Sequence, residues 1–233
     1  MSEGKDTEMM FDAEVAEEQN RRVKGEPEME TQPEVKIQFP SNTIICAAPK
    51  SGKSSMILSI IDGAEFDHIF VVSGTPENSN FADIADVVLP TVSEKFLQDL
   101  ISCHEEQCLK TLLIWDDFIG TESSGFNVKN SPAVNRIASS GRHKNISTIF
   151  SSQDWTSIPI TVRRMANYYF LGENNFDVNK NLSKILANGS MPPKKLFGEL
   201  SDISSKHTFE FIMYDRLDKK SWHKLMPSIR SGN

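Results

Sequence analysis

The segment "CAAPKSGKSS", Cys46–Ser55, decides how the rest of the chain is interpreted. Loops that bind phosphate between a strand and a helix follow the pattern G-x-x-x-x-G-K-[ST]. Gly52, Lys53 and Ser54 match the last three positions, whereas Ala47 stands where the first glycine belongs. A G-K-[ST] triplet is common by chance, so the neighbouring sequence has to show whether this one binds phosphate.

The flanks of this loop predict a strand before it and a helix after it. "NTIICA" (Asn42–Ala47) is a short apolar run rich in β-branched residues, and "SSMILSIIDG" (Ser54–Gly63) has helical composition and ends at a glycine. A loop in this setting points backbone N–H groups at one spot, where the helix N-terminus adds partial positive charge. We therefore expect ATP to bind through the loop residues, which are Ala48, Pro49, Lys50, Ser51, Gly52, Lys53, Ser54 and Ser55.

Individual loop residues have different expected roles. Lys53 would reach the terminal phosphates, the Ser54 hydroxyl would hold Mg²⁺, and Gly52 would let the backbone approach the ligand. The first glycine of the pattern mainly eases the exit from the strand, so Ala47 costs little where its φ is negative. Pro49 fixes one φ of the loop near about −65°.

The remaining chain alternates between strand-like and helix-like segments. Strands are expected at residues 68–74, 111–118, 145–153 and 167–172, helices at 93–106 and 131–141, and a helix-rich stretch at 177–200 precedes a last strand at 207–215. This order predicts an α/β fold with a mainly parallel sheet and helices on both faces.

Polar residues end two of the predicted strands. Asp116 and Asp117 follow the apolar residues of "TLLIWDDF", which would place them beside the phosphate loop at the carboxyl edge of the sheet. Asp116 would bind the Mg²⁺ shell, and Asp117 would orient or deprotonate the attacking water. Gln153 ends "FSSQ" and could sense the γ-phosphate. The alternatives are a solvated acidic strand end and an ordinary turn glutamine.

Three arginines are candidates for a finger that reaches into a neighbouring subunit's site. Arg142 lies in "SSGRHKN", and Arg163 and Arg164 lie in "PITVRRMAN". A guanidinium offered across a subunit boundary stabilises the charge on a transferring phosphoryl group. The alternative for each is an ordinary surface arginine.

The charge of the chain is concentrated at its beginning. Residues 1–34 hold 11 acidic and 4 basic residues, a net charge of −7 that equals the formal charge of the whole chain. We expect a disordered acidic tail over residues 1–38, a P-loop domain over 39–215 and a short basic segment over 216–233. An amphipathic helix at Met9–Val23 that docks on a neighbour or a shell protein is the alternative for the tail.

Two classes of segment are not expected. The sequence has no run of about 18 apolar residues and no basic, then apolar N-terminus, so neither a membrane span nor a signal peptide is expected, and we expect a soluble intracellular protein. Cys46, Cys103 and Cys108 lack paired metal-ligand spacing and are interpreted as reduced structural thiols.

The motifs together resemble a known family. "AAPKSGKSS", "LLIWDDF" and "SGRHKNISTIFSSQDW", with the spacing between them, are similar to the FtsK/HerA superfamily of DNA-pumping ATPases. The resemblance is greatest to the genome-packaging ATPases of poxviruses and other double-stranded DNA viruses with double jelly-roll capsids, including virophages. It covers roughly Phe39 to Tyr214. Asp117 departs from it, because many relatives carry glutamate there.

The resemblance implies a fold, cofactors and partners. It implies a RecA-like (ASCE) P-loop NTPase in which the fourth predicted strand lies beside the P-loop strand and brings Gln153 to the γ-phosphate. It also implies a ring, commonly hexameric, with ATP and Mg²⁺ at subunit interfaces, double-stranded DNA in the pore, and capsid or portal-vertex proteins as possible partners. By position, Arg142 ranks above Arg164 and Arg163 as the finger.

Two hypotheses about function follow. The first is an ATP-hydrolysing motor that translocates double-stranded DNA into a preformed capsid at a viral assembly site inside the host cell. The loop that carries Lys129 is then a candidate pore element, and the basic end with Lys219, Lys220 and Lys224 is a candidate DNA or capsid contact, with an ordinary solvated surface as the alternative. The second is a nucleotide-dependent assembly switch or adaptor that recruits capsid or membrane partners through its acidic tail. A small-molecule kinase is disfavoured, because no lid segment or acceptor-substrate motif is evident.

Overall fold

A computed structural model describes six stretches of the chain. They are residues 37–76, 80–117, 126–187, 191–206, 209–217 and 221–227. The chain divides between Glu34 and Val35, and all described residues belong to the second unit. Residues 1–36 of the acidic tail expected over 1–38, and Lys219 and Lys220 with their expected contacts, therefore lie outside the described residues.

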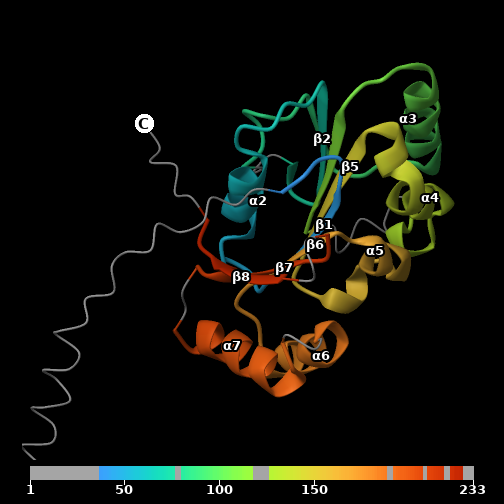
Figure 1. Cartoon of the computed structure of the whole chain (residues 1–233). Helices are drawn as coiled ribbons and strands as arrows, with labels where there is room; N and C mark the ends of the chain where they lie inside the picture. Colours follow the sequence, from blue (N-terminus) through green and yellow to red (C-terminus); the bar gives the residue numbers. More distant parts are fainter. Residues whose placement is uncertain are drawn as a thin grey trace, which may run out of the picture. The chain divides into compact units, whose positions relative to one another are not determined.

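One sheet of eight strands organises the described residues, in the order β3-β2-β4-β5-β1-β6-β7-β8 (Figure 1). The first six strands along the chain pair with one another in parallel, whereas β7 pairs antiparallel with both β6 and β8. The strands are β1 (Asn42–Cys46), β2 (His68–Ser73), β3 (Val87–Leu89), β4 (Thr111–Asp116), β5 (Ile146–Ser152), β6 (Tyr168–Leu171), β7 (Phe211–Asp215) and β8 (Ser221–Leu225).

The P-loop strand β1 lies between β5 and β6. Every residue of β1 is buried, as expected for a strand covered on both faces. The strand predicted fourth along the chain is β5, and it pairs with β1 from Asn42–Thr148 to Cys46–Ser152. The implied adjacency of these two strands is therefore confirmed, and so is the mainly parallel sheet.

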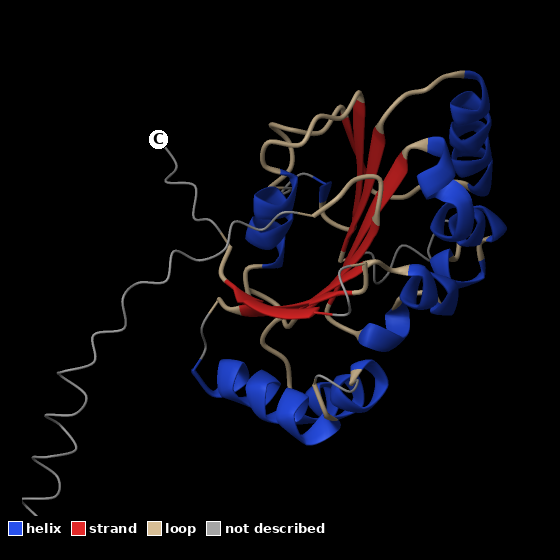
Figure 2. Cartoon of the chain, viewed as in Figure 1, coloured by secondary structure: helices blue, strands red, loops and turns tan. Residues whose placement is uncertain are grey.

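Helices cover both faces of the sheet (Figure 2). Helix α2 packs on one face, and α3 to α7 contribute to the apolar cluster on the other face. None of these helices is long and apolar enough to span a bilayer. Their bounds are α2 (Lys53–Ile61), α3 (Glu94–Glu106), α4 (Pro132–Ser140), α5 (Ile160–Met165), α6 (Phe176–Leu186) and α7 (Pro193–Lys206).

Local sequence signals explain where several helices begin. The Ser93 side chain accepts the N–H of Phe96 at the start of α3, as its capping role predicts. Ser131 caps α4 in the same way, with Pro132 in the first helical turn. The predicted helices over 93–106 and 131–141 are thus confirmed to within one or two residues.

Three elements go beyond the sequence expectations. β3 has only three residues, α5 only six, and β8 lies inside the segment expected to be a basic tail. The sheet therefore continues past residue 215, because β8 completes a hairpin with β7. Short elements give too little periodicity to be recognised, and β8 depends on pairing with a partner rather than on its own composition. The helix-rich stretch 177–200 is divided between α6 and α7.

Close packing surrounds Gly172, the residue that follows β6. A Cβ placed on Gly172 would lie 2.7 Å from Phe211 Cε1 and 2.9 Å from the Cβ of Ala47. Real Cβ atoms do not approach other atoms so closely, and the β1–β6 pairing holds both backbones in place. The extra methyl group of Ala47 is thus accommodated by the missing side chain of Gly172.

We predict that Gly172→Ala destabilises the protein by about 1–3 kcal/mol, because the new methyl group overpacks this contact. Gly198→Ala is the matched control, since it lies in α7 with no atom within 4 Å of its Cβ position. The control should be stabilising by about 0.5–1 kcal/mol. Urea unfolding measures both, and equal effects of the two substitutions would contradict the packing argument.

Candidate nucleotide-binding site

Three strands end together at one edge of the sheet, and the phosphate loop starts there. β1 and β5 are in register at Cys46 and Ser152, and β4 and β5 at Asp116 and Ser151. The loop therefore leaves β1 beside the residues that follow β4 and β5. Parallel α/β sheets bind ligands at this carboxyl edge, where the sheet order changes direction.

Neighbouring strands hold both sides of the loop entrance. The N–H of Ala47 donates to the carbonyl of Ser152, the last residue of β5 (3.2 Å), and the N–H of Ala48 donates to the carbonyl of Glu173 after β6 (2.6 Å). The buried Asn174 amide donates to the carbonyl of Cys46 (3.1 Å). The start of the loop is therefore fixed by contacts that do not involve a ligand.

The backbone of the loop has its special conformations at two other positions. Lys50 and Gly52 have φ values of 60° and 87°, whereas the φ of Ala47 is not positive. Alanine is therefore compatible with the position of the first glycine, as expected. Glycine is required at position 52, because L side chains rarely adopt that φ.

Helix α2 begins without a side-chain cap. Its N-cap is Gly52, its first turn has no acidic residue, and it is nine residues long. In contrast, Ser93, Ser131 and Asn175 cap α3, α4 and α6. The N–H groups of the first turn of α2 are thus left for an anion, as at phosphate-binding helix termini.

Lys53 links the loop to the end of β4. Its buried ammonium group donates to the carbonyls of Ala47 (3.1 Å) and Ala48 (2.9 Å). The same Nζ lies 3.6 Å from Oδ2 of Asp117. A buried cation needs such partners to offset its lost hydration. The lysine is thus poised between the loop and the acidic residue.

Asp117 and Gln153 contact each other at this edge. The Gln153 Nε2 donates to Asp117 Oδ2 at 3.0 Å, and the N–H of Asp117 donates to Ser151 at 3.1 Å. Asp117 has a φ of 42°, a left-handed conformation that aspartate tolerates better than most residues. Its Oδ1 is buried and has no hydrogen-bond partner among the described residues. The hydrogen-bond acceptor capacity of this oxygen is therefore unused by the described residues.

Two groups beside the loop have shifted pKa values. Burial, and secondly the charge of Asp117, raise the pKa of Asp116 above its usual range. Crowding of negative charge at the strand end is what a divalent cation relieves, so Asp116 fits the Mg²⁺ role expected of it together with Ser54.

Burial raises the pKa of the Cys46 thiol to about 12, which keeps this free cysteine protonated and unreactive.

The candidate arginines lie away from the loop of their own chain. Arg142 belongs to a 3₁₀ helix, Gly141–Lys144, that leads into the amino end of β5, and Arg163 and Arg164 lie on α5, which leads into β6. These amino ends form the edge of the parallel strands opposite to the phosphate loop. The structure therefore brings Lys53, Asp116, Asp117 and Gln153 together but does not bring Arg142 or Arg164 to them.

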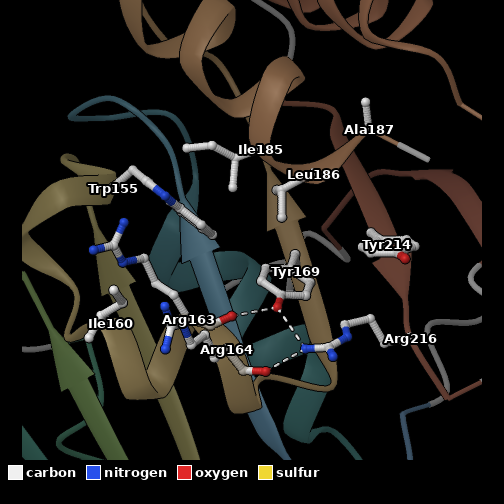
Figure 3. A pocket seen from close by; sticks show the side chains of 10 residues that line it. All are labelled: Trp155, Ile160, Arg163, Arg164, Tyr169, Ile185, Leu186, Ala187, Tyr214 and Arg216. Atoms are coloured by element: carbon white, nitrogen blue, oxygen red, sulfur yellow. Dashed lines mark hydrogen bonds between the residues drawn. The ribbon is translucent and has the colours of Figure 1, made fainter.

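The α5 arginines line a pocket of about 540 Å³ between α5, α6 and the sheet (Figure 3). The Arg163 guanidinium lies over the Trp155 ring, 5.6 Å from its centroid. Arg216 donates to the carbonyls of Arg164 (2.7 Å) and Ala166 (3.0 Å), so its role is to fix the end of α5. The Arg164 side chain is exposed.

The predicted DNA-contacting lysines have different surroundings. Lys129 lies exposed in a 3₁₀ helix, Val128–Asn130, just after the part of the loop that is not described. Lys224 instead lies 3.3 Å from the carboxylate of Glu210 and 3.9 Å from that of Asp202. Lys129 thus remains the more available of the two cations.

Sequence reasoning missed the residues that follow β6 and precede β7. Glu173 and Asn174 hold the loop entrance, and exposed Phe209 lies beside Gly52. The one signal available for Glu173 and Asn174 was their position after "NYYFLG", at the carboxyl end of a predicted strand, whereas Phe209 lies inside the strand predicted over 207–215. Their contacts depend on β6 and β7 lying on the far side of β1 from β5, which no local pattern encodes.

Comparisons with known proteins give matches in structure only. No protein-family model matches the chain, and a search of curated proteins finds no match. The genome packaging NTPase B204 from Sulfolobus turreted icosahedral virus 2, solved in complex with ATP-gammaS, matches with a TM-score of 0.59 and 16% identity, covering 82% of this chain and 99% of B204. The chain has the RecA-like P-loop NTPase fold.

Two larger proteins share this fold with the chain. The pCW3 conjugation coupling protein TcpA has a TM-score of 0.52 and 13% identity, and the match covers 80% of this chain and 60% of TcpA. EssC (ATPases 2 and 3) from Geobacillus thermodenitrificans has a TM-score of 0.55 and 10% identity, and the match covers 83% of this chain and 41% of EssC. The expected similarity to genome-packaging ATPases is thus confirmed for the fold, which TcpA and EssC also share.

We predict that Asp116→Asn raises the melting temperature at neutral pH without nucleotide. A raised folded-state pKa means that stability present at low pH is lost as the pH rises through that pKa, and asparagine removes the charge responsible. Each kcal/mol gained in the free energy of unfolding should raise the melting temperature by about 2–4 °C. The gain should shrink on acidification, as followed by calorimetry.

Asp99→Asn is the control for this prediction. Asp99 is an exposed residue of α3 whose partner, Lys95, is also exposed, so its loss should change the free energy of unfolding by less than about 1 kcal/mol. A lower melting temperature for Asp116→Asn than for the control would show that Asp116 is not under charge strain.

Proposed function

We propose that this protein is an ATP-hydrolysing motor that translocates double-stranded DNA into a preformed viral capsid. The observation that supports it most is the chain of contacts from the uncapped phosphate loop through Lys53 to Asp117 and Gln153. This arrangement can hold a triphosphate and a water molecule on adjacent sides of one buried ammonium group. The packaging function itself is supported by the similarity in fold to the genome packaging NTPase B204.

The residues of the site fit a nucleotide with Mg²⁺. The loop N–H groups and Lys53 would bind the phosphates, and Ser54 with Asp116 would hold the metal shell. When bound, ATP would supply the phosphoryl group, and Mg²⁺ would supply positive charge that neutralises the negative charge developing on the phosphate oxygens. Asp117 then orients the attacking water and takes its proton at the free Oδ1, while Gln153 fixes the Asp117 carboxylate through its Oδ2.

A neighbouring subunit would complete this site. All arginines of the described residues lie on α4, on α5 or beside the amino ends of strands, and none of them is placed at the phosphate loop of its own chain. Arg142 at a ring interface would supply the missing guanidinium in trans, with Arg164 as the second choice. A closed ring, such as a hexamer, is the assembly that satisfies every site in this way.

DNA would be held loosely in this assembly. Residues 35–233 contain 21 acidic and 21 basic residues, which does not fit a broad phosphate-binding face. A motor that steps needs only a few cations in its pore, and Lys129 is the described candidate. We further propose that the protein contacts a capsid or portal vertex and acts at viral assembly sites in the host cell.

We predict ATP hydrolysis that rises when duplex DNA is added, measured as phosphate release. Lys53→Ala should lower turnover by at least about 100-fold with the fold retained, because it removes the ammonium group that faces the transferring phosphate. The control is Lys95→Ala, which removes an exposed lysine of α3. Tight ATP binding without turnover, with or without DNA, would contradict the motor and favour the assembly switch.

A mixing experiment tests the trans arginine. Subunits with Lys53→Ala and subunits with Arg142→Ala should each be inactive, yet mixed rings should regain part of the hydrolysis, because some intact loops then face an intact arginine. Mixing Lys53→Ala with Asp117→Asn is the control and should regain nothing, since both residues serve the same site. No recovery with Arg142→Ala, but recovery with Arg164→Ala, would move the finger to α5.

A further inference from the structure

Strand β7 starts at the same sheet edge as the phosphate loop. It runs antiparallel to β6, so its first residues lie beside the end of β6, with Ile212 opposite Leu171. Phe211 packs against the Gly172 backbone, next to the Cβ of Ala47. The residues just before β7 therefore lie at the loop edge of the sheet.

Phe209 is exposed at this edge and lies beside the loop glycine. Its Cδ1 lies 3.2 Å from the position of a Cβ on Gly52. Side chains two residues apart in extended chain share a face, yet Phe211 is fully buried while Phe209 is 54% exposed. Among the described residues, the Phe209 ring thus belongs to neither apolar cluster of the fold and stays more than half open to solvent beside the phosphate loop.

The position of Phe209 corresponds to one end of a bound nucleotide. Asp117 and Gln153 follow β4 and β5, on one side of β1, whereas β6 and β7 lie on the other side. Terminal phosphates held at Lys53 face the Asp117 side. The rest of the nucleotide then extends from the first turn of α2 toward β7, where Phe209 lies.

We propose that the Phe209 ring stacks on the purine base of the nucleotide held by the phosphate loop. This inference rests on the proposed function, because it requires a nucleoside triphosphate at that loop. An aromatic ring offers its face to any base and reads no hydrogen-bonding edge. Phe209 thus increases affinity for the nucleoside part of the ligand and contributes nothing to binding of the phosphates.

Binding of two ligands, ATP and inorganic tripolyphosphate, tests this proposal by calorimetry. Phe209→Ala should weaken ATP binding about 5- to 150-fold, the range that corresponds to ~1–3 kcal/mol of stacking. Tripolyphosphate binding should be unchanged, because that ligand has no base. Phe209→Trp should retain ATP affinity and show a fluorescence change with ATP but none with tripolyphosphate.

Leu217→Ala is the matched control, because Leu217 is an exposed apolar residue two positions beyond the other end of β7. It should bind both ligands like the wild type. An unchanged ATP affinity in Phe209→Ala, or an equal loss for both ligands, would overturn the stacking role alone. A wild-type protein that binds neither ligand would instead overturn the proposed function.

Discussion

The placement of β1 between β5 and β6 is the constraint on which the rest of the site depends. This pairing brings the end of β1 into register with Ser152 on one side and Leu171 on the other. The loop that follows is then held by carbonyl groups from both neighbours, at Ser152 and Glu173. A loop fixed in this way needs little reorganisation to bind phosphate, which is how a preorganised site stabilises developing charge.

The electrostatics of the site balance one buried cation against two neighbouring acids. Lys53 has carbonyl partners and Asp117 close by, so the ammonium charge is compensated without a ligand. Asp116 is only partly compensated, since burial and the charge of Asp117 raise its pKa more than a Ser151 hydrogen bond and the charge of Lys53 lower it. The strand end thus holds excess negative charge, a stability cost of the kind that functional sites commonly retain.

The departure from the glycine pattern at Ala47 is explained by backbone conformation and packing. Its backbone does not need a positive φ, and its methyl group occupies space that Gly172 leaves open. The two positions lie more than a hundred residues apart, so the exchange is visible only where β1 and β6 pair. The glycine requirement of the loop remains at Gly52, which also adjoins Phe209.

The sequence by itself determined the fold class, the P-loop, the acidic strand end and Gln153, because strand and helix periodicities and a contiguous motif are local properties. It also indicated that strands ending in Asp117 and Gln153 would meet, since parallel strands share their carboxyl edge. Only the tertiary structure decided that Glu173, Asn174 and Phe209 adjoin the loop, that β8 extends the sheet, and that Arg142 and Arg164 lie at the opposite edge. These facts depend on strand order and on the direction of β7, which arise from long-range pairing and leave no periodic signal in the chain.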